Sequence, residues 1–438
     1  MKITQKKISI GLSIGLIVLF CFSCQENKSN QVAKQKINEN KELTARDILG
    51  NKNYLAISYG GYRKNSRDLQ PTVDELKQDM KIISAAGTRI IRTYNTKLAH
   101  ASNVLKAIKE LKDEDPNFEM YVMLGAWINC ENAWTENPNH DGEDEEENAA
   151  EIQRAVDLAN AYPGIVKIIA VGNEAMVKWA ASYFVQPKVI LKWVNHLQKL
   201  KKTGILSEDL WITSSDNFAS WGGGDAIYHT TDLTALIKAV DYVSLHTYPL
   251  HDTHYNPDFW GVDAAEMGLS KAEQINKAMN RSLDYAVAQY EQTSNYIKNL
   301  GINKTVHIGE SGWASRSNGF YGPDGSKATD EYKQALYHKL FRTWSEKNSV
   351  SCFYFEAFDE TWKDAKNPGG SENHFGLFTI DGKAKYTLWN LVDKGVFEGM
   401  RRGGNEIVKT FNGDETALMK NVEVPQIKKE LEMNFEKK

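Results

Sequence analysis

The chain has 438 residues, of which 41% are hydrophobic and 25% are charged, and its formal net charge is −4. A chain of this length can bury one large core or two smaller ones. Its slightly acidic balance supplies no basic surface for a phosphate backbone, so nucleic acid is excluded as an expected partner.

The N-terminus has the pattern of an export signal. Three lysines lie within the first seven residues, an apolar run follows over residues 8–22, and Ser23 and Cys24 end it. A run this short before a small residue is typical of a signal peptide rather than of a spanning helix. Cys24 resembles the lipidated cysteine of bacterial lipoproteins, although residues 21–23 depart from the usual lipobox. An ordinary cleaved signal and a retained anchor helix are the alternatives.

We therefore predict a signal peptide over residues 1–23, lipid attachment at Cys24, and an exported outer-membrane lipoprotein that is periplasmic or at the cell surface. Removing residues 1–23 removes three lysines and no acidic residue, so the net charge changes from −4 to −7. The segment that follows is polar and rich in Asn, Lys and Gln. Such a composition predicts a flexible tether, which we place over residues 24–48.

Eight short runs of β-branched and aromatic residues follow, with helical spacing between them. Thr72 and Glu75 form a capping-box pattern before Leu76, and acidic residues precede a helical pattern that includes Ile152. The expected strands are residues 54–59, 88–93, 120–125, 165–171, 210–214, 240–246, 305–309 and 350–356.

Strands that alternate with helices pair in parallel through right-handed crossovers. Eight such units favour a (β/α)8 TIM barrel over an open doubly wound sheet, and we place this catalytic domain over residues 49–395. No Gly-rich phosphate loop opens a helix, which argues against nucleotide binding. We expect the extension over residues 396–438 to pack on the base of the barrel as a strand or helix, with a solvated end.

Two acidic residues stand at the ends of predicted strands. Glu174 follows the apolar run "IIAVGN", and Glu310 lies in "VHIGESGWAS". Active sites of this fold lie at the carboxyl ends of the strands, and strands four and seven lie on opposite sides of the ring. Opposed carboxylates suit glycosidic cleavage, because one protonates the leaving oxygen while the other attacks or activates water.

These segments resemble glycoside hydrolase family 17, the β-1,3-glucanases. "IAVGNEAM" is similar to the family's acid/base segment, and "GESGWAS" is similar to its nucleophile segment, with Ala314 in place of the usual proline. The resemblance spans roughly residues 54–391. Its other motifs are "RTYN" at 92–95, "HTYPL" at 246–250, "FEAFDETWK" at 355–363 and "SENHFGLF" at 371–378.

The resemblance implies a role for each matching residue. Glu174 would be the acid/base, Glu310 the ionised nucleophile about 5–5.5 Å away, and Asn173 a ligand of the sugar 2-hydroxyl. Tyr248 would donate a hydrogen bond to Glu310 and keep its pKa low. The remaining substrate-binding residues that it implies are Tyr94, Glu360, Lys363 and Glu372.

Aromatic residues at strand exits offer stacking surfaces for glucose rings. Trp313 and Trp362 are the foremost candidates, and the others, which loop cores would also explain, are Trp127, Trp134, Trp221 and Trp260. The long loop over residues 249–279 is expected to form one wall of the groove.

We expect no metal and no cofactor. His246, His251 and His254 are interpreted as loop histidines rather than as metal ligands. The run "EDEEE" at 143–147 is interpreted as a solvated insertion or an acidic first helical turn rather than as a calcium site. Outside the leader, the cysteines are expected to be two buried free thiols, with a disulfide as the alternative.

The expected function is a retaining endo-β-1,3-glucanase that hydrolyses laminarin-type glucan. The expected partners are the glucan itself and a membrane reached only through the N-terminal lipid, and the expected oligomeric state is monomeric. A β-1,3-glucanosyltransferase, a non-catalytic glycan-binding protein on a TIM barrel, and a different linkage specificity are the alternatives.

Overall fold

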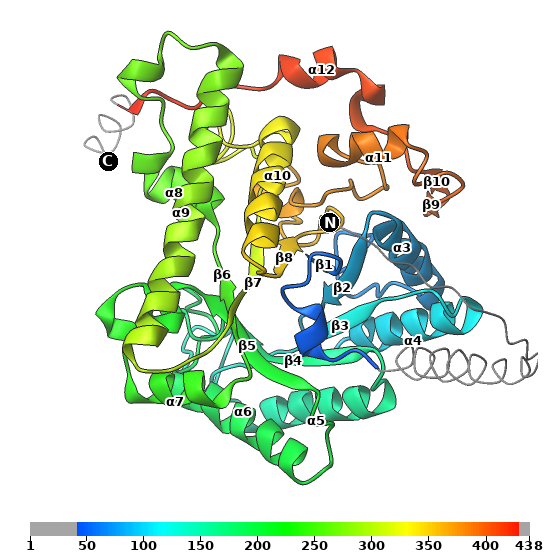
Figure 1. Cartoon of the computed structure of the whole chain (residues 1–438), viewed down its shortest axis with the longest axis vertical. Helices are drawn as coiled ribbons and strands as arrows, with labels where there is room; N and C mark the ends of the chain where they lie inside the picture. The colour runs from blue at the N-terminus through cyan, green and yellow to red at the C-terminus, as the bar shows by residue number, and fades with distance from the viewer. Residues whose placement is uncertain (1–41, 429–438) are drawn as a thin grey trace, which may run out of the picture. The chain divides into compact units, whose positions relative to one another are not determined.

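The structure is a computed structural model, and it describes residues 42–428 (Figure 1). The predicted signal peptide, Cys24 and most of the predicted tether lie outside these residues. Between residues 42 and 428, no helix combines the length and apolar character that crossing a bilayer requires.

Eight parallel strands close into a barrel in the order β1 to β8. The ring closes where β1 pairs with β8, with Ala56 opposite Phe353 and Ile57 opposite Tyr354. The predicted TIM barrel is therefore confirmed. The strands are β1 (Leu55–Ser58), β2 (Thr88–Arg92), β3 (Tyr121–Ala126), β4 (Val166–Asn173), β5 (Trp211–Asn217), β6 (Val243–His246), β7 (Val306–Gly312) and β8 (Cys352–Phe355).

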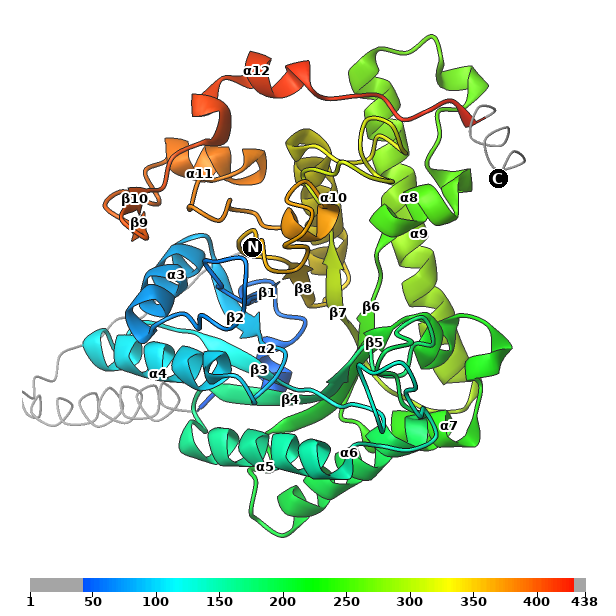
Figure 2. The ribbon, with the colours of Figure 1, turned by 180° about the vertical axis from the view of Figure 1, so that it is seen from behind.

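Helices follow the strands and surround the barrel, as Figures 1 and 2 show from opposite sides. They are α2 (Ala45–Ile48), α3 (Val73–Ala85), α4 (Ala99–Glu114), α5 (Glu145–Ala161), α6 (Pro187–Lys202), α7 (Thr231–Ala239), α8 (Pro249–Tyr255), α9 (Lys271–Asn299), α10 (Glu331–Lys347), α11 (Trp389–Asp393) and α12 (Glu415–Lys420). Short helical turns lie at Ala219–Gly223, Ala226–Tyr228, Pro257–Phe259, Ala264–Glu266, Ser371–Asn373, Tyr386–Leu388 and Thr410–Gly413.

The predicted capping box is present at the start of α3. The Thr72 backbone N–H donates to Glu75 Oε2 at 2.9 Å, and the Glu75 N–H donates to Thr72 Oγ1 at 3.3 Å. Behind the box, Leu76, Met80 and Ile83 are buried at helical spacing. The cap satisfies backbone donors that the first turn would otherwise leave unpaired, while the apolar stripe attaches the helix to the sheet.

The acidic run 143–147 leads into the first turn of α5, as one of the two interpretations predicted. The Asp144 side chain caps the helix by accepting from the Glu147 N–H at 3.2 Å. Glu143 accepts from Lys192 at 2.5 Å and from the Trp193 indole at 2.7 Å. The run is therefore held by cations and hydrogen-bond donors of the protein itself.

The predicted tether boundary at residue 48 is wrong. Thr44 and Asp47 form a capping box at the start of α2, and Ala45 and Ile48 are buried. The apolar side chains of this short helix need a core contact, so the ordered chain begins before residue 49.

The C-terminal extension does not pack on the base of the barrel as predicted. Its hairpin strands, β9 (Arg401–Arg402) and β10 (Asn405–Glu406), place Arg402 against Asp79 of α3, with Arg402 Nε 2.9 Å from Asp79 Oδ1. Further on, the segment pairs with the loop after β6, where the Val262 N–H donates to the Gln426 carbonyl at 2.9 Å. In Figures 1 and 2 this orange-to-red segment runs from α11 to the region of α8 and α9. The Arg402 ion pair, the backbone pairing with Val262 and buried side chains between them, such as Leu418 and Val422, attach the extension along this path.

Both cysteines of the barrel, Cys130 and Cys352, are buried free thiols, which confirms the predicted state.

Candidate active site

A cleft of about 1210 Å³ contains the two predicted acids, Glu174 and Glu310. Residues of the loops that follow the strands line it, which places it at the carboxyl ends of the barrel. Three other polar side chains of the site, Arg92, Asn173 and His246, are the last residues of β2, β4 and β6. The strand ends therefore bring together residues that are far apart in the sequence.

Glu174 stands directly after β4 in a backbone turn of unusual conformation. Gly172 and Glu174 have positive φ angles of 79° and 47°. A Cβ atom at position 172 would approach the Ala175 side chain to 2.9 Å, so only glycine fits there. The Glu174 N–H donates to the Ser215 carbonyl of β5 at 3.0 Å and fixes the turn. The "VGNEA" sequence thus turns the acid into the cleft at a backbone position that non-glycine residues rarely adopt.

Glu310 lies within β7 and is 5% exposed. Its two carboxylate oxygens have separate donors. Arg92 Nη1 donates to Oε1 at 2.5 Å, and the Tyr248 hydroxyl donates to Oε2 at 2.8 Å. Both donors stabilise the ionised carboxylate and hold its orientation.

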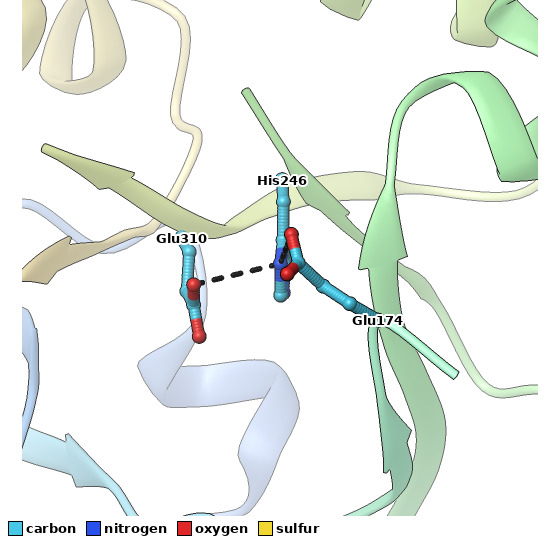
Figure 3. Close-up of side chains that lie close together, drawn as sticks. All are labelled: Glu174, His246 and Glu310. Atoms are coloured by element: carbon cyan, nitrogen blue, oxygen red, sulfur yellow. Dashed lines mark hydrogen bonds and ion pairs between the residues drawn. The ribbon is translucent and has the colours of Figure 1, made fainter. Parts of the chain in front are cut away.

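The imidazole of His246 lies between the two carboxylates, as Figure 3 shows. Its Nδ1 atom is 3.1 Å from Glu174 Oε1 and 3.6 Å from Glu310 Oε2. On the other side of the ring, Arg92 Nη1 is 3.2 Å from Nε2, and Ser215 Oγ is 2.7 Å from Nε2. A guanidinium can only donate, so Nε2 accepts from Arg92 and a ring proton lies on Nδ1. The Nδ1 N–H therefore points at the Glu174 carboxylate and orients it.

The electrostatics separate Glu310 from an ordinary buried acid. Burial by itself would raise the pKa of Glu310, but His246, Arg92 and the Tyr248 hydroxyl outweigh burial, so this pKa lies below its ordinary value of 4.5. Burial, and then the negative charge of Glu310, raise the pKa of Tyr248 well above its usual range. Glu310 is thus ionised beside a tyrosine that keeps its proton and donates it in a hydrogen bond.

Arg92 also orients Asn173. Its Nη2 atom donates to Asn173 Oδ1 at 2.6 Å, which leaves the amide NH₂ group of Asn173 as the donor for a ligand. The guanidinium lies over the ring of Tyr94, 4.7 Å from its centroid, and both Tyr94 and Asn173 line the cleft. The predicted positions of Asn173, Tyr94 and Tyr248 in one site are therefore observed.

Sequence reasoning missed the roles of Arg92 and His246. Arg92 lies in the "RTYN" motif and His246 lies in the "HTYPL" motif, but a role in the site was predicted only for the tyrosine of each motif. The apolar pair Ile90 and Ile91 leads directly into Arg92 at the end of the strand, and a charge in that position was the signal that should have identified Arg92. His246 was interpreted as a loop histidine, although the expected strand 240–246 ends on it; in the structure it ends β6 and is fully buried.

The residues after β8 form another part of the cleft wall. Glu360 accepts from the Tyr62 N–H at 3.0 Å and from the Trp362 indole at 3.1 Å. Lys363 Nζ donates to the buried carboxylate of Glu356 at 2.6 Å. The predicted site residues of this region all line the cleft, namely Glu360, Trp362, Lys363 and Glu372.

The prediction of Trp313 as a sugar-stacking residue is wrong. Its side chain is 0% exposed, its indole donates to the Ala328 carbonyl at 2.8 Å, and it packs on Trp260 and Tyr337. The position of Trp313 directly after β7 did not expose its side chain to the cleft, because the loop after β7 folds back over the indole ring. Trp221 and Trp260 are buried in the same way. By contrast, the indoles that line the cleft include Trp127, Trp134, Trp362 and the unpredicted Trp179.

The three histidines do not converge on one point. His251 Nδ1 is 3.0 Å from the Tyr321 hydroxyl, and the ring of His254 stacks on Phe320. In the described part of the chain, the group whose ligand atoms come within 4.8 Å of one another is Glu174, His246 and Glu310. That group is the carboxylate pair with its bridging imidazole.

Comparisons with known proteins agree with this geometry. Residues 56–376 match the family described as the BtgE/BtgC glycoside hydrolase domain. The chain is 69% identical to an endo-laminarinase from Formosa Hel1_33_131 of known crystal structure, over 88% of this chain and 98% of that one, with a TM-score of 0.87.

More distant relatives are fungal. A glucan 1,3-beta-glucosidase of Arthroderma benhamiae is 26% identical over 73% of this chain and 86% of its own length. The probable glucan endo-1,3-beta-glucosidase btgC of Aspergillus fumigatus is 26% identical over 70% of this chain but only 38% of its own length. The chain belongs to the BtgE/BtgC glycoside hydrolase domain family, which confirms the enzyme class that its sequence motifs predicted.

Proposed function

We propose that this chain is an endo-β-1,3-glucanase that hydrolyses laminarin-type glucan and retains the anomeric configuration. The observation that carries the proposal is the pair Glu174 and Glu310, whose carboxylate oxygens come within 4.8 Å of each other. Retaining glycosidases hold their carboxyl groups about 5–5.5 Å apart, whereas inverting ones leave about 6.5–9.5 Å for a water molecule. The endo-laminarinase at 69% identity supports the choice of substrate and of cleavage within the chain.

In the first step, a Glu310 carboxylate oxygen attacks the anomeric carbon of the sugar. The bond to the leaving oxygen breaks, and Glu174 gives its proton to that oxygen. A glycosyl ester of Glu310 forms on one side and a shortened glucan leaves on the other. Arg92 and Tyr248 suit Glu310 to this role, because they keep it ionised and aimed before the attack.

In the second step, Glu174 removes a proton from water as the water oxygen attacks the same carbon. The ester bond to Glu310 breaks, and the carboxylate returns to its ionised form with its two donors. Two inversions at one carbon give net retention. The amide of Asn173 is placed to hold the sugar hydroxyl group next to the reacting carbon, because Arg92 occupies its carbonyl oxygen.

The test is product analysis of the purified protein on linear β-1,3-glucan, with proton NMR of the first products. We expect a ladder of short oligosaccharides that appear as the β-anomer. An α-anomer would contradict retention, and release of glucose alone would contradict cleavage within the chain. Products longer than a starting oligosaccharide would indicate glucanosyl transfer, and binding without cleavage would indicate a glycan-binding protein.

Export, a lipid on Cys24 and a monomeric state are part of the same proposal. The lysines, the apolar run and the cysteine of residues 1–24 support the first two. Intact mass of the protein from a membrane fraction, beside the variant Cys24→Ala, tests the anchor. We expect a lipid mass on the wild type and release of the variant from the membrane, and equal partition of both would contradict the anchor.

A further inference from the structure

Three aromatic side chains gather in the two loops that flank Glu174. Trp127 and Trp134 belong to the loop after β3, and Tyr183 belongs to the loop after β4. We propose that these three rings, the indole platform, bind the glucan segment on the leaving-group side of the cleaved bond through Trp127 and Trp134, which line the cleft, with Tyr183 in ring contact with both, and that Asn129 is the positioning residue that holds the platform. This inference rests on the proposed function, and it specifies which side of the cleft holds the part of the glucan that leaves.

The three rings form one aromatic cluster. Trp134 stacks on Tyr183 with centroids 4.9 Å apart and planes inclined by 23°. Trp127 lies 5.0 Å from Tyr183 and 6.3 Å from Trp134. Even so, Trp134 is 60% exposed and lines the cleft. A large apolar ring held in water at the mouth of a cleft is the usual surface on which the apolar face of a sugar ring stacks.

A single acceptor atom holds both indoles. Asn129 Oδ1 accepts from Trp127 Nε1 at 2.8 Å and from Trp134 Nε1 at 3.2 Å. The main chain of Asn129 is itself fixed by the side-chain amide of Asn148 of α5: the Asn129 N–H donates to Asn148 Oδ1 at 2.9 Å, and Asn148 Nδ2 donates to the Asn129 carbonyl at 2.9 Å. The Trp134 N–H donates to the Ser182 carbonyl at 2.8 Å and joins the two loops. The platform is therefore ordered before any ligand arrives, which reduces the entropy lost on binding.

The side of the cleft follows from the role of Glu174. The general acid must contact the oxygen that leaves, so the sugars that depart lie on the Glu174 side of the cleaved bond. Trp127 is the first residue after β3, and Tyr183 follows Glu174 within one loop. After burial, the negative charge of Glu174 is the largest cause of the raised pKa of Tyr183. By contrast, Trp362 belongs to the loop after β8, on the opposite side of the ring.

Two consequences follow for the reaction. Contacts between the platform and the leaving segment strengthen the binding of substrates that extend past the cleaved bond. This favours cleavage within a glucan chain. The platform also holds an acceptor sugar after the first step. The acceptor hydroxyl oxygen then bonds to the anomeric carbon, its proton passes to Glu174, and the ester bond to Glu310 breaks. The platform thus sets how often an acceptor sugar, rather than water, attacks the glycosyl ester of Glu310.

The test compares a substrate whose sugars extend past the cleaved bond with one that has no sugar there. Laminarihexaose extends across the platform, whereas 4-nitrophenyl β-laminaribioside carries only the aryl leaving group there. For Trp134→Ala we expect kcat/KM on the hexaose to fall about tenfold, equivalent to about 1.4 kcal/mol, and kcat/KM on the aryl glycoside to stay within twofold of the wild type. Transfer products at high oligosaccharide concentration should fall as well.

Variants at position 129 separate placement of the platform from a general loss of structure. Asn129→Asp keeps an acceptor oxygen and should retain the wild-type ratio between the two substrates. Asn129→Ala lacks the acceptor and should reproduce the loss on the hexaose. Phe411→Ala removes an exposed ring of the C-terminal extension that does not line the cleft, and it should change neither rate.

Equal losses on both substrates, or no loss on the hexaose, would overturn the inference. If the wild type cleaves neither substrate, the proposed function fails, and calorimetric titration of laminarihexaose still decides the platform. Weaker binding by Trp134→Ala than by the wild type would then support it, and equal binding would overturn it.

Discussion

The carboxylates of Glu174 and Glu310 reach each other from opposite sides of the barrel, and their oxygens come within 4.8 Å. The two residues differ in their surroundings. Glu310 is buried between a guanidinium and a phenol, while Glu174 stands at a turn beside the imidazole of His246. This asymmetry suits Glu310 to the proposed role of nucleophile and Glu174 to the proposed role of acid/base.

Removal of each carboxylate should have a different chemical signature. For Glu174→Ala, we expect kcat on glucan to fall 10²–10⁴-fold, because the leaving oxygen is no longer protonated. The fall in kcat on an aryl glycoside should be smaller, since an aryl leaving group needs little protonation. Azide should restore activity and give a β-glycosyl azide, detected by NMR.

Glu310→Ala is the matched comparison. Azide should enter its vacant nucleophile position and give an α-glycosyl azide from a β-fluoride donor. The reverse pairing of variants and products would contradict the assignment of roles.

Tyr248→Phe should move the acid limb of the pH–rate profile upward. The Tyr248 hydroxyl donates to ionised Glu310 and lowers its pKa, so its removal raises that pKa and the limb of kcat/KM by roughly one pH unit. In the wild type, ionised Glu310 also adds folding stability that is fully present above the unfolded pKa and is lost as the pH falls through the lowered folded pKa. Tyr321→Phe, elsewhere in the same cleft, should leave the limb unchanged. An unmoved limb in Tyr248→Phe would count against control of this pKa by the hydroxyl.

Two adjacent arginines should differ strongly in their effect on stability. Arg402 is 1% exposed and pairs with fully buried Asp79, so Arg402→Ala should lower the free energy of unfolding by about 3 kcal/mol. Arg401 pairs with Glu406 at the surface, and Arg401→Ala should cost less than about 1 kcal/mol. Urea unfolding at pH 7 measures both. Similar values for the two variants would show that the extension is not anchored through Asp79.

Chelation should not reduce activity, whereas added Zn²⁺ should. The acidic run before α5 already has protein partners, since Glu143 accepts from Lys192 and Glu147 accepts from Lys97 at 2.8 Å. Zn²⁺ prefers nitrogen and oxygen ligands in the arrangement that His246 and the two catalytic carboxylates provide. We expect full activity in EDTA and inhibition by micromolar Zn²⁺ that EDTA reverses. Activity lost in EDTA and restored by Ca²⁺ would point to a structural calcium ion.

Comparison of the two tryptophans chosen for sugar stacking shows where sequence reasoning ends. Trp313 and Trp362 both follow a strand that ends in the cleft, yet only Trp362 lines it. Trp313 is covered because the segment that leads to α10 folds over its indole and bonds it through Ala328. The local sequence around a tryptophan does not indicate whether a later segment of the chain will cover its ring.

The amino-acid sequence by itself determined the barrel and its two acids. Strand and helix periodicity are local properties, and the "GNE" and "GES" segments bring each acid to the end of a strand whatever the distant loops do. Only the tertiary structure decided that Arg92 binds the Glu310 carboxylate, that His246 lies between both carboxylates, and that Arg402 reaches Asp79. Each of these contacts joins residues from different strands, helices or strand exits that are far apart in the sequence, and burial and pKa depend on what packs around a side chain rather than on its neighbours in the sequence.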